Sequence, residues 1–286
     1  MMSVLILETV ADVKKFVHNA KAKKLTIGLV PTMGALHDGH ITLMKHAKET
    51  CDIVIASVFV NPTQFGPNED FDAYPRTFGE DYAKLTAVGV DAVFHPSVEE
   101  LYPIGYSTFI TVDGGITDKL CGAKRPGHFR GVATVVTKLI NITEADKAFF
   151  GQKDAQQVVV IKRFVSDLNL NIDIEMVPIV RDNNGLALSS RNKYLSAEEK
   201  RSALVLSRSL KAVAELIADG EKQVEVIKAR LIEKIKAEPL SDIDYVEIYS
   251  FPELKEISLI NEPVLIAVAV RFGTTRLIDN IIVGGK

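Results

Sequence analysis

The sequence predicts an α/β protein with a Rossmann-like, parallel-sheet N-terminal domain at residues 1–177 and a smaller, lid-like α+β C-terminal domain at residues 178–286. The first part alternates short β-rich runs with amphipathic helical patterns, which is typical of a parallel sheet with crossover helices. A polar, turn-forming segment, residues 181–185, then separates this part from two helical patterns and several strand-like runs. The chain of 286 residues also exceeds the usual length of one domain.

Each element of the N-terminal part follows from its pattern of apolar residues. The predicted strands are short and rich in β-branched or aromatic residues, and they lie at residues 25–30, 53–60, 92–94, 147–150 and 172–177. Apolar side chains recur at helical spacing over residues 132–140 and 158–168, so these segments are predicted helices. Each apolar stripe would cover one face of the sheet.

The C-terminal part is predicted to contain two helices followed by a small antiparallel sheet. Apolar residues at helical spacing run from Leu206 to Ile217 and from Val224 to Ile235, with charged residues on the opposite faces. The closing strand-like runs lie at residues 245–249, 264–270 and 277–281.

Composition excludes several classes of protein. The formal net charge is -3 and no basic run is present, so we expect no nucleic-acid partner. No apolar run approaches the roughly 18 residues that a membrane-spanning helix needs, and we expect no membrane association. The chain has 2 cysteines, which lie outside any CxxC pattern and are too few for a disulfide framework. We therefore expect a cytoplasmic protein.

The segment PTMGALHDGH, residues 31–40, is the most informative about function, because it leaves a predicted strand and enters a helix near Asp38. Residues at positions i and i+3 share one helical face, so His37 and His40 can project the same way. The N-terminus of a helix favours phosphate, and open α/β sheets bind ligands beyond the carboxyl ends of their strands. Imidazole N–H groups placed there can stabilise the charge that develops when a carboxylate attacks the α-phosphorus of ATP. The alternative is a helix cap and a surface residue.

Two further segments carry groups suited to phosphate. Gly151 to Asp154 form a second predicted strand-to-helix turn, where Lys153 can meet phosphate charge; the alternative is a solvated lysine. Ser189, Ser190 and Arg191 lie beyond the polar segment, and two hydroxyls with a guanidinium can hold a leaving pyrophosphate. Their alternative is an ordinary helix cap.

Gln64 is a candidate for recognising a hydroxyl or a carboxylate. Gln64 lies in the predicted loop 61–66 after a strand, and its amide both donates and accepts hydrogen bonds. The alternative is a solvent-exposed loop. Gln157 follows Asp154 by three positions, which places both on one side of the predicted helix.

Six blocks together resemble the pantoate:beta-alanine ligase (pantothenate synthetase) family of the HxGH nucleotidyltransferase superfamily, which also includes class I aminoacyl-tRNA synthetases. They occur in the order and spacing of the family between residue 25 and about residue 195. The blocks are PTMGALHDGH at 31–40, FVNPTQFG at 59–66, YPRT at 74–77, RPGHFRGV at 125–132, GQKDAQQ at 151–157 and SSRN at 189–192.

The resemblance implies that ATP, with Mg²⁺, activates pantoate as an adenylate that beta-alanine then attacks. It implies that His40, His37, Lys153 and Arg191 are the catalytic residues. The positions that it assigns to ATP binding are Thr32, Met33, His37, Gly39, His40, Gly151, Lys153, Asp154, Val180, Leu188, Ser189, Ser190 and Arg191. Those that it assigns to the other substrates are Gln64, Gln157, Asn61 and Met33, with Gln64 also near beta-alanine.

The same resemblance implies one metal contact and one assembly state. An acidic residue after the YPRT block assists the magnesium of ATP in the family, and Glu80 and Asp81 match that position. Magnesium takes only one or two protein carboxylates, so a sparse protein site is expected. Arg125 and His128 are further candidates to close over the site. Relatives form homodimers, and we expect the same here.

Other functions remain as alternatives. One is a nucleotidyltransferase of the same superfamily that transfers a nucleotide without ligation, and another is a catalytically silent nucleotide-binding regulator. Two classes are disfavoured because their motifs are absent from the sequence: a hydrolase with a G-x-S-x-G elbow and a dehydrogenase with G-x-G-x-x-G after its first strand.

Overall fold

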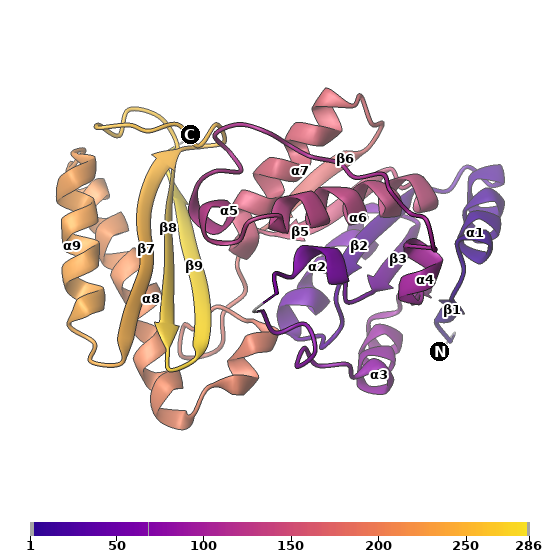
Figure 1. The fold of residues 1–286 in the computed structure, drawn as a ribbon, viewed down its shortest axis with the longest axis horizontal. Coiled ribbons are helices and arrows are strands. Elements are labelled where there is room, and N and C mark those ends of the chain that lie inside the picture. Colours follow the sequence, from indigo (N-terminus) through magenta and orange to yellow (C-terminus); the bar gives the residue numbers. More distant parts are fainter. Residues whose placement is uncertain (1–2, 68, 285–286) are drawn as a thin grey trace. The chain divides into compact units, whose positions relative to one another are not determined.

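The computed structural model describes residues 3–67 and 69–284, which form two compact units (Figure 1). Of the described residues, the first unit comprises 3–67, 69–117, 121–152 and 156–178, and the second comprises 118–120, 153–155 and 179–284. The chain thus passes into the second unit next to the boundary predicted at residues 177 and 178. Two short segments from the N-terminal part also belong to the second unit, and one of them contains Lys153.

The first unit is built on a six-stranded sheet with the order β1-β4-β3-β2-β5-β6. All its neighbouring strands are parallel, which confirms the predicted Rossmann-like fold class. The strands are β1 (Leu5–Leu7), β2 (Ile27–Thr32), β3 (Ile53–Val58), β4 (Ala92–Phe94), β5 (Lys147–Gly151) and β6 (Asp173–Val177).

The strand order reverses direction between β2 and β5. From β2 the chain continues to β3 and β4 on one side, whereas β5 pairs with β2 on the other side. In open α/β sheets, ligands bind at such a switch point, outside the carboxyl ends of the strands. The turns that leave β2 and β5 begin the segments 31–40 and 151–154, so both predicted phosphate-binding turns start at this position.

Helices cover both faces of the sheet. Val30 belongs to an apolar cluster with residues of α2 and α3, whereas Ile27 and Leu29 are equally buried and, by strand alternation, point to the other face. Helix α6 contacts β2 and also α1. The helices of this unit are α1 (Val10–Ala22), α2 (Asp38–Thr50), α3 (Phe78–Val88), α4 (Val98–Leu101), α6 (His128–Thr143) and α7 (Ala155–Asp167), with a short α5 (Leu120–Lys124) that begins in the second unit.

The second unit is a three-stranded antiparallel sheet with two helices, as predicted. Its strands are β7 (Ser241–Ser250), β8 (Val264–Phe272) and β9 (Thr275–Val283), in the order β7-β8-β9. The predicted apolar stripes of α8 (Ala197–Ala218) and α9 (Val224–Lys236) lie in one buried cluster with these strands. No helix in the described part of the chain is both long and apolar enough to cross a membrane.

Candidate active site

The turn that leaves β2 doubles back sharply before α2 begins. Gly34 and Ala35 have φ angles of 78° and 49°, in the left-handed region that L-residues rarely adopt. The hydroxyl of Thr32 donates to the Ser57 carbonyl at 2.7 Å and accepts the Gly34 N–H at 3.2 Å. The predicted ATP-binding residues Thr32 and Met33 therefore lie in a backbone that is hydrogen-bonded to β3, and Gly39 follows in the first turn of α2.

His37 and His40 cap helix α2 with their own side chains. Nδ1 of His37 accepts the Gly39 N–H at 3.2 Å, and Nδ1 of His40 accepts the His37 N–H at 3.3 Å, which together form a capping box. The two ring centroids are 4.0 Å apart. Both residues are partly exposed.

This capping decides which ring nitrogen can donate. A neutral imidazole whose Nδ1 accepts a hydrogen bond carries its proton on Nε2, so both rings present Nε2–H as a donor. A phosphoryl oxygen needs such donors. A helix-capping role and a role as a donor to phosphoryl oxygens are thus compatible for His37, because the cap sets the Nε2–H tautomer that such donation requires.

Gln64 is oriented by a buried neighbour in the short 3₁₀ helix η1 (Pro62–Gln64). The Nδ2 group of Asn61 donates to Gln64 Oε1 at 3.0 Å, which leaves the Nε2 group of Gln64 as the donor that faces Met33 Sδ at 3.2 Å. Sulfur is a weak acceptor, so an oxygen of a ligand can replace it. Gln64 is thereby prepared to donate to a hydroxyl or a carboxylate.

Asn61 itself is only 1% exposed, although the resemblance assigns it to substrate binding. Its Nδ2 group also donates to the Gly131 carbonyl at 3.2 Å, and its Oδ1 accepts the Tyr102 hydroxyl at 2.9 Å. The geometry therefore gives Asn61 the role of orienting Gln64. Tyr102 is a residue that the sequence did not single out, because it lies far from the loop along the chain.

The adjacent glutamines of α7 separate into two roles. Gln157 is partly exposed in the first turn of the helix, as a ligand-binding residue must be. Gln156 is buried, and it accepts the Cys121 N–H at 2.9 Å and donates to the Ile116 carbonyl at 2.8 Å. Gln156 thus holds the first turn of α5 and the segment before it.

The two carboxylates predicted to assist magnesium diverge in the first turn of α3. Glu80 is exposed, whereas Asp81 is 0% exposed and accepts the N–H groups of Leu36 and Ala35 at 2.7 Å and 2.9 Å. The structure therefore leaves Glu80 as the accessible one of the pair. Across residues 3–67 and 69–284, no three histidine, cysteine or acidic side chains are grouped so as to hold a metal ion, which accords with a sparse site completed by nucleotide and water.

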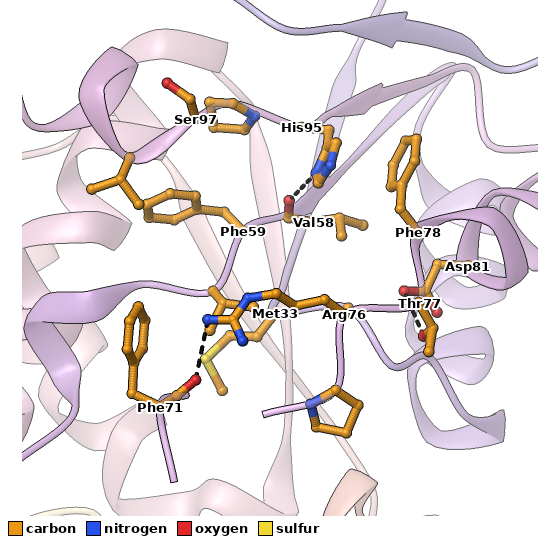
Figure 2. Close-up of a pocket in the computed structure, with 15 residues that line it drawn as sticks. Met33, Val58, Phe59, Phe71, Arg76, Thr77, Phe78, Asp81, His95 and Ser97 are labelled. Carbon is orange, nitrogen blue, oxygen red and sulfur yellow. Dashed lines mark hydrogen bonds between the residues drawn. The ribbon is translucent and has the colours of Figure 1, made fainter. Parts of the chain in front are cut away.

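A cavity of ≈ 280 Å³ adjoins the histidine-bearing turn (Figure 2). Figure 2 shows His95 hydrogen-bonded to the Val58 carbonyl, and Phe78 stacks on its ring with centroids 3.9 Å apart. His95 is thus a packed residue. The cavity is lined by Met33, Gly34, Val58, Phe59, Val60, Phe71, Pro75, Arg76, Thr77, Phe78, Asp81, His95, Pro96, Ser97 and Val98.

Arg125 and His128 form a clamp on the loop that carries Gln64. Arg125 makes a bidentate pair with Glu69, with N–O distances of 2.7 Å and 2.6 Å, and its Nη1 lies 2.9 Å from His128 Nε2. Nδ1 of His128 donates to the Gln64 carbonyl at 2.9 Å. Burial raises the pKa of the Glu69 carboxyl, but the hydrogen bond and charge of Arg125 outweigh it, and the net pKa lies below its ordinary value.

The lowered pKa of Glu69 predicts how the clamp responds to pH. Because the folded-state pKa is depressed, ionised Glu69 stabilises the protein above its unfolded-state pKa of about 4.3, and this is lost as the pH falls through the folded value. Glu69→Gln is therefore expected to lower the melting temperature at pH 7, and the difference from wild type should shrink as the pH falls below the unfolded-state pKa and through the lower folded-state pKa. Melting curves across this range, with the exposed Glu99→Gln as control, test it. A constant difference at every pH would contradict an ionic clamp.

The predicted nucleotide-binding residues of the second unit form a local group. The N–H of Leu188 donates to the Val180 carbonyl at 3.0 Å, and the Asn280 side chain of β9 donates to the Lys153 carbonyl at 3.0 Å. Ser189 caps the 3₁₀ helix η3 (Ser190–Tyr194) by accepting the Arg191 N–H at 3.3 Å. Ser189 thus caps only η3, whereas the N-terminus of α8 is capped by Ser196 and Glu199.

A partly buried ion pair fixes the backbone of this group. Arg181 makes a bidentate pair with Asp279, which is 2% exposed, at 2.6 Å and 2.9 Å, and also donates to the Gly185 carbonyl. The backbones of Arg181 and Ala187 also pair in an isolated antiparallel β-bridge. Asp279 and Asn280 were not predicted, because both lie in a strand near the end of the chain and no motif includes them.

The parallel sheet, its switch point and the capped histidine pair define an α/β enzyme of the HxGH nucleotidyltransferase class. The family model described as pantoate-beta-alanine ligase matches residues 5–282. The chain therefore belongs to the pantoate-beta-alanine ligase family.

Individual relatives agree over nearly the whole chain. A pantothenate synthetase of Pelotomaculum thermopropionicum is 56% identical over 280 residues, which cover 98% of this chain and 99% of the relative. A pantothenate synthetase structure from Thermus thermophilus is 42% identical with a TM-score of 0.93, covering 97% of this chain and 99% of that one. A pantoate-beta-alanine ligase from Francisella tularensis, complexed with beta-gamma ATP and beta-alanine, is 35% identical with a TM-score of 0.79, covering 98% of each chain.

Proposed function

We propose that the protein ligates pantoate and beta-alanine to pantothenate with ATP. In the first step a carboxylate oxygen of pantoate attacks the α-phosphorus of ATP, forming pantoyl-adenylate and releasing pyrophosphate. In the second step the amine of beta-alanine attacks the acyl carbon and loses a proton to solvent, the acyl–phosphate bond breaks, and AMP leaves with the bonding electrons. The capped histidine pair carries this proposal, because it offers two Nε2–H donors at a helix N-terminus.

The remaining roles follow from the chemistry of each side chain. His37 and His40 stabilise charge on the phosphoryl oxygens, and Lys153 and Arg191 bind the phosphates. Gln64 and Gln157 donate to the hydroxyl and carboxylate oxygens of pantoate. The site works mainly by positioning the reactants and by keeping water from the adenylate.

Magnesium is the metal that this proposal requires with ATP. The exposed carboxylate of Glu80 in α3 is the protein group that fits it, since Mg²⁺ keeps most of its ligands as water and nucleotide oxygens. When bound, the ion neutralises charge on the phosphates. Chelation of Mg²⁺ with excess EDTA is therefore expected to stop adenylate formation.

The assembly and location that we propose are those of the family. The protein acts as a homodimer in the cytoplasm, without nucleic-acid or membrane partners. Its cysteines are buried thiols, which suits a reducing compartment. Sedimentation equilibrium of the purified protein tests the dimer, and a monomer across the micromolar range would contradict it.

Product analysis tests the proposed reaction against its alternatives. With ATP, Mg²⁺ and pantoate, we expect one pyrophosphate per active site and a bound adenylate. Addition of beta-alanine should then release AMP and an amide, both of which mass spectrometry identifies. A nucleotide that stays attached to the product would indicate simple nucleotidyl transfer. ATP binding without beta-alanine-dependent AMP release would indicate a silent regulator.

A further inference from the structure

Helix α3 holds the turn that precedes the histidine pair through one buried carboxylate. Oδ1 of Asp81 accepts the Leu36 N–H at 2.7 Å, and Oδ2 accepts the Ala35 N–H at 2.9 Å. The Thr77 hydroxyl also donates to Oδ2, at 3.3 Å (Figure 2). Asp81 is 0% exposed, so its oxygens are satisfied by the protein itself rather than by solvent.

The turn needs a group of this kind because its backbone is in a conformation that is unfavourable by itself. Gly34 and Ala35 are consecutive residues with positive φ, and a non-glycine residue such as Ala35 persists there only when its surroundings enforce it. Successive N–H groups in such a turn form a concave site for an anion. The carboxylate of Asp81 occupies that position. A Cβ added at Gly34 would lie 3.0 Å from Asp81 Oδ2, so the turn is closed tightly around the carboxylate.

A second residue of α3 fixes the same turn from its carbonyl side. Nζ of Lys84 donates to the Leu36 carbonyl at 2.6 Å. Asp81 and Lys84 are three positions apart, so they project from one face of the helix. One helix face therefore fixes both the N–H and the C=O of Leu36, the residue immediately before His37.

The orientation of the peptide after Leu36 bears directly on the imidazole of His40. The peptide that links Leu36 to His37 carries the N–H that Nδ1 of His40 accepts. A rotation of this peptide removes that donor, and the His40 ring is then no longer held in its Nε2–H form. The chain of contacts runs from Asp81 and Lys84 through Leu36 to the cap of α2.

We propose that Asp81, supported by Lys84, is a positioning residue that holds the 34–36 turn and thereby fixes the Nε2–H tautomer of His40. This role replaces the metal contact expected for Asp81 from the sequence. Its kinetic consequence rests on the proposed function, whereas its effect on the tautomer does not.

Asp81→Asn tests the proposal, because an amide presents an NH₂ group to one of the two backbone N–H donors. We expect the rate of adenylate formation to fall roughly tenfold or more, with a smaller change in the KM for ATP. Two-bond ¹H–¹⁵N spectra of the ligand-free protein should show that His40 loses the Nε2–H pattern of wild type, whereas His37, whose Nδ1 accepts the Gly39 N–H, should change less. The Mg²⁺ concentration for half-maximal rate should stay unchanged.

Asp52→Asn is the matched control. Asp52 also accepts a backbone N–H and a hydroxyl, both from Thr26, but it does so at the amino end of β2. The Asp52→Asn variant should form the adenylate at the wild-type rate and show wild-type histidine spectra. Lys84→Met is a second variant that keeps the buried carboxylate, and it should shift the spectra in the same direction as Asp81→Asn.

Two results would overturn the proposal. One is an Asp81→Asn protein with wild-type histidine spectra and a several-fold higher Mg²⁺ requirement, which would make Asp81 a metal ligand. The other is a lower melting temperature with unchanged spectra and rate, which would make its role purely structural. If Asp81→Asn does not fold, unchanged spectra in Lys84→Met overturn it. Because the spectra need no substrate, they remain decisive even if wild-type protein failed to ligate pantoate.

Discussion

Replacement of His40 with alanine is expected to slow pantoyl-adenylate formation by about 10²- to 10³-fold, the cost of one preorganised donor to an oxyanion. The Nε2–H of His40 is aimed by the cap, because its Nδ1 already accepts the His37 N–H. The donor matters most when charge builds on the phosphoryl oxygens, so the affinity for ATP should change much less. Rapid-quench measurement of pyrophosphate in a single turnover tests this.

Two isosteric variants separate the donor from the cap. Asn at position 40 can keep an acceptor near the position of Nδ1 but lacks the distant donor, whereas Gln can place an N–H near the position of Nε2. We expect His40→Asn to be as slow as His40→Ala, although its helix cap is retained. His40→Gln should recover part of the rate. Single-turnover adenylate formation at the wild-type rate in His40→Asn would remove the imidazole from the mechanism.

The sequence predicts the elements that have a strong local pattern. The parallel sheet, the histidine-bearing turn and the two-helix C-terminal unit follow from runs and periods within short segments. Strand β1 (Leu5–Leu7) was not predicted, because three residues at the edge of the sheet, with Leu5 and Ile6 exposed, give no period. Strand β2 extends to Thr32 rather than ending at residue 30, since Pro31 and Thr32 still pair with β3.

The contacts that orient the site could not be predicted, because they join residues that are distant along the chain. The hydrogen bond between Asp81 and Leu36 joins residues 45 positions apart in the sequence, and that between Asn61 and Gly131 joins residues 70 positions apart. Both side chains belong to blocks or positions that the family resemblance marks as functional. What the sequence alone cannot give is whether such a side chain faces a ligand or holds a neighbour, which depends on burial in the folded chain.

Gly131→Ala is the second substitution for which we expect a large loss of activity. Gly131 lies in α6, where the helix backbone comes close to the loop that carries Gln64. A Cβ at this position would lie 2.6 Å from the Gln64 Cα and closer still to the Thr63 carbonyl, and both are backbone atoms that cannot move aside alone. The loop must therefore shift, and with it the bond from Asn61 to the Gly131 carbonyl. Overpacking of this kind costs about 1–3 kcal/mol of folding stability. Because the shifted loop carries Gln64, we also expect the KM for pantoate to rise, by roughly 10- to 100-fold, as for a binding group misplaced by about 1 Å.

Gly79→Ala provides the matched control, because this glycine lies in α3 and an added Cβ would meet nothing within 4 Å. Alanine is also the better helix former, so the control should be as stable as wild type or slightly more so. Isothermal titration of pantoate and of ATP separates a local shift from unfolding, since ATP affinity should survive in Gly131→Ala. A wild-type KM for pantoate in that variant would mean that the loop yields without moving Gln64, and the orientation of its amide by Asn61 would then lose its functional meaning.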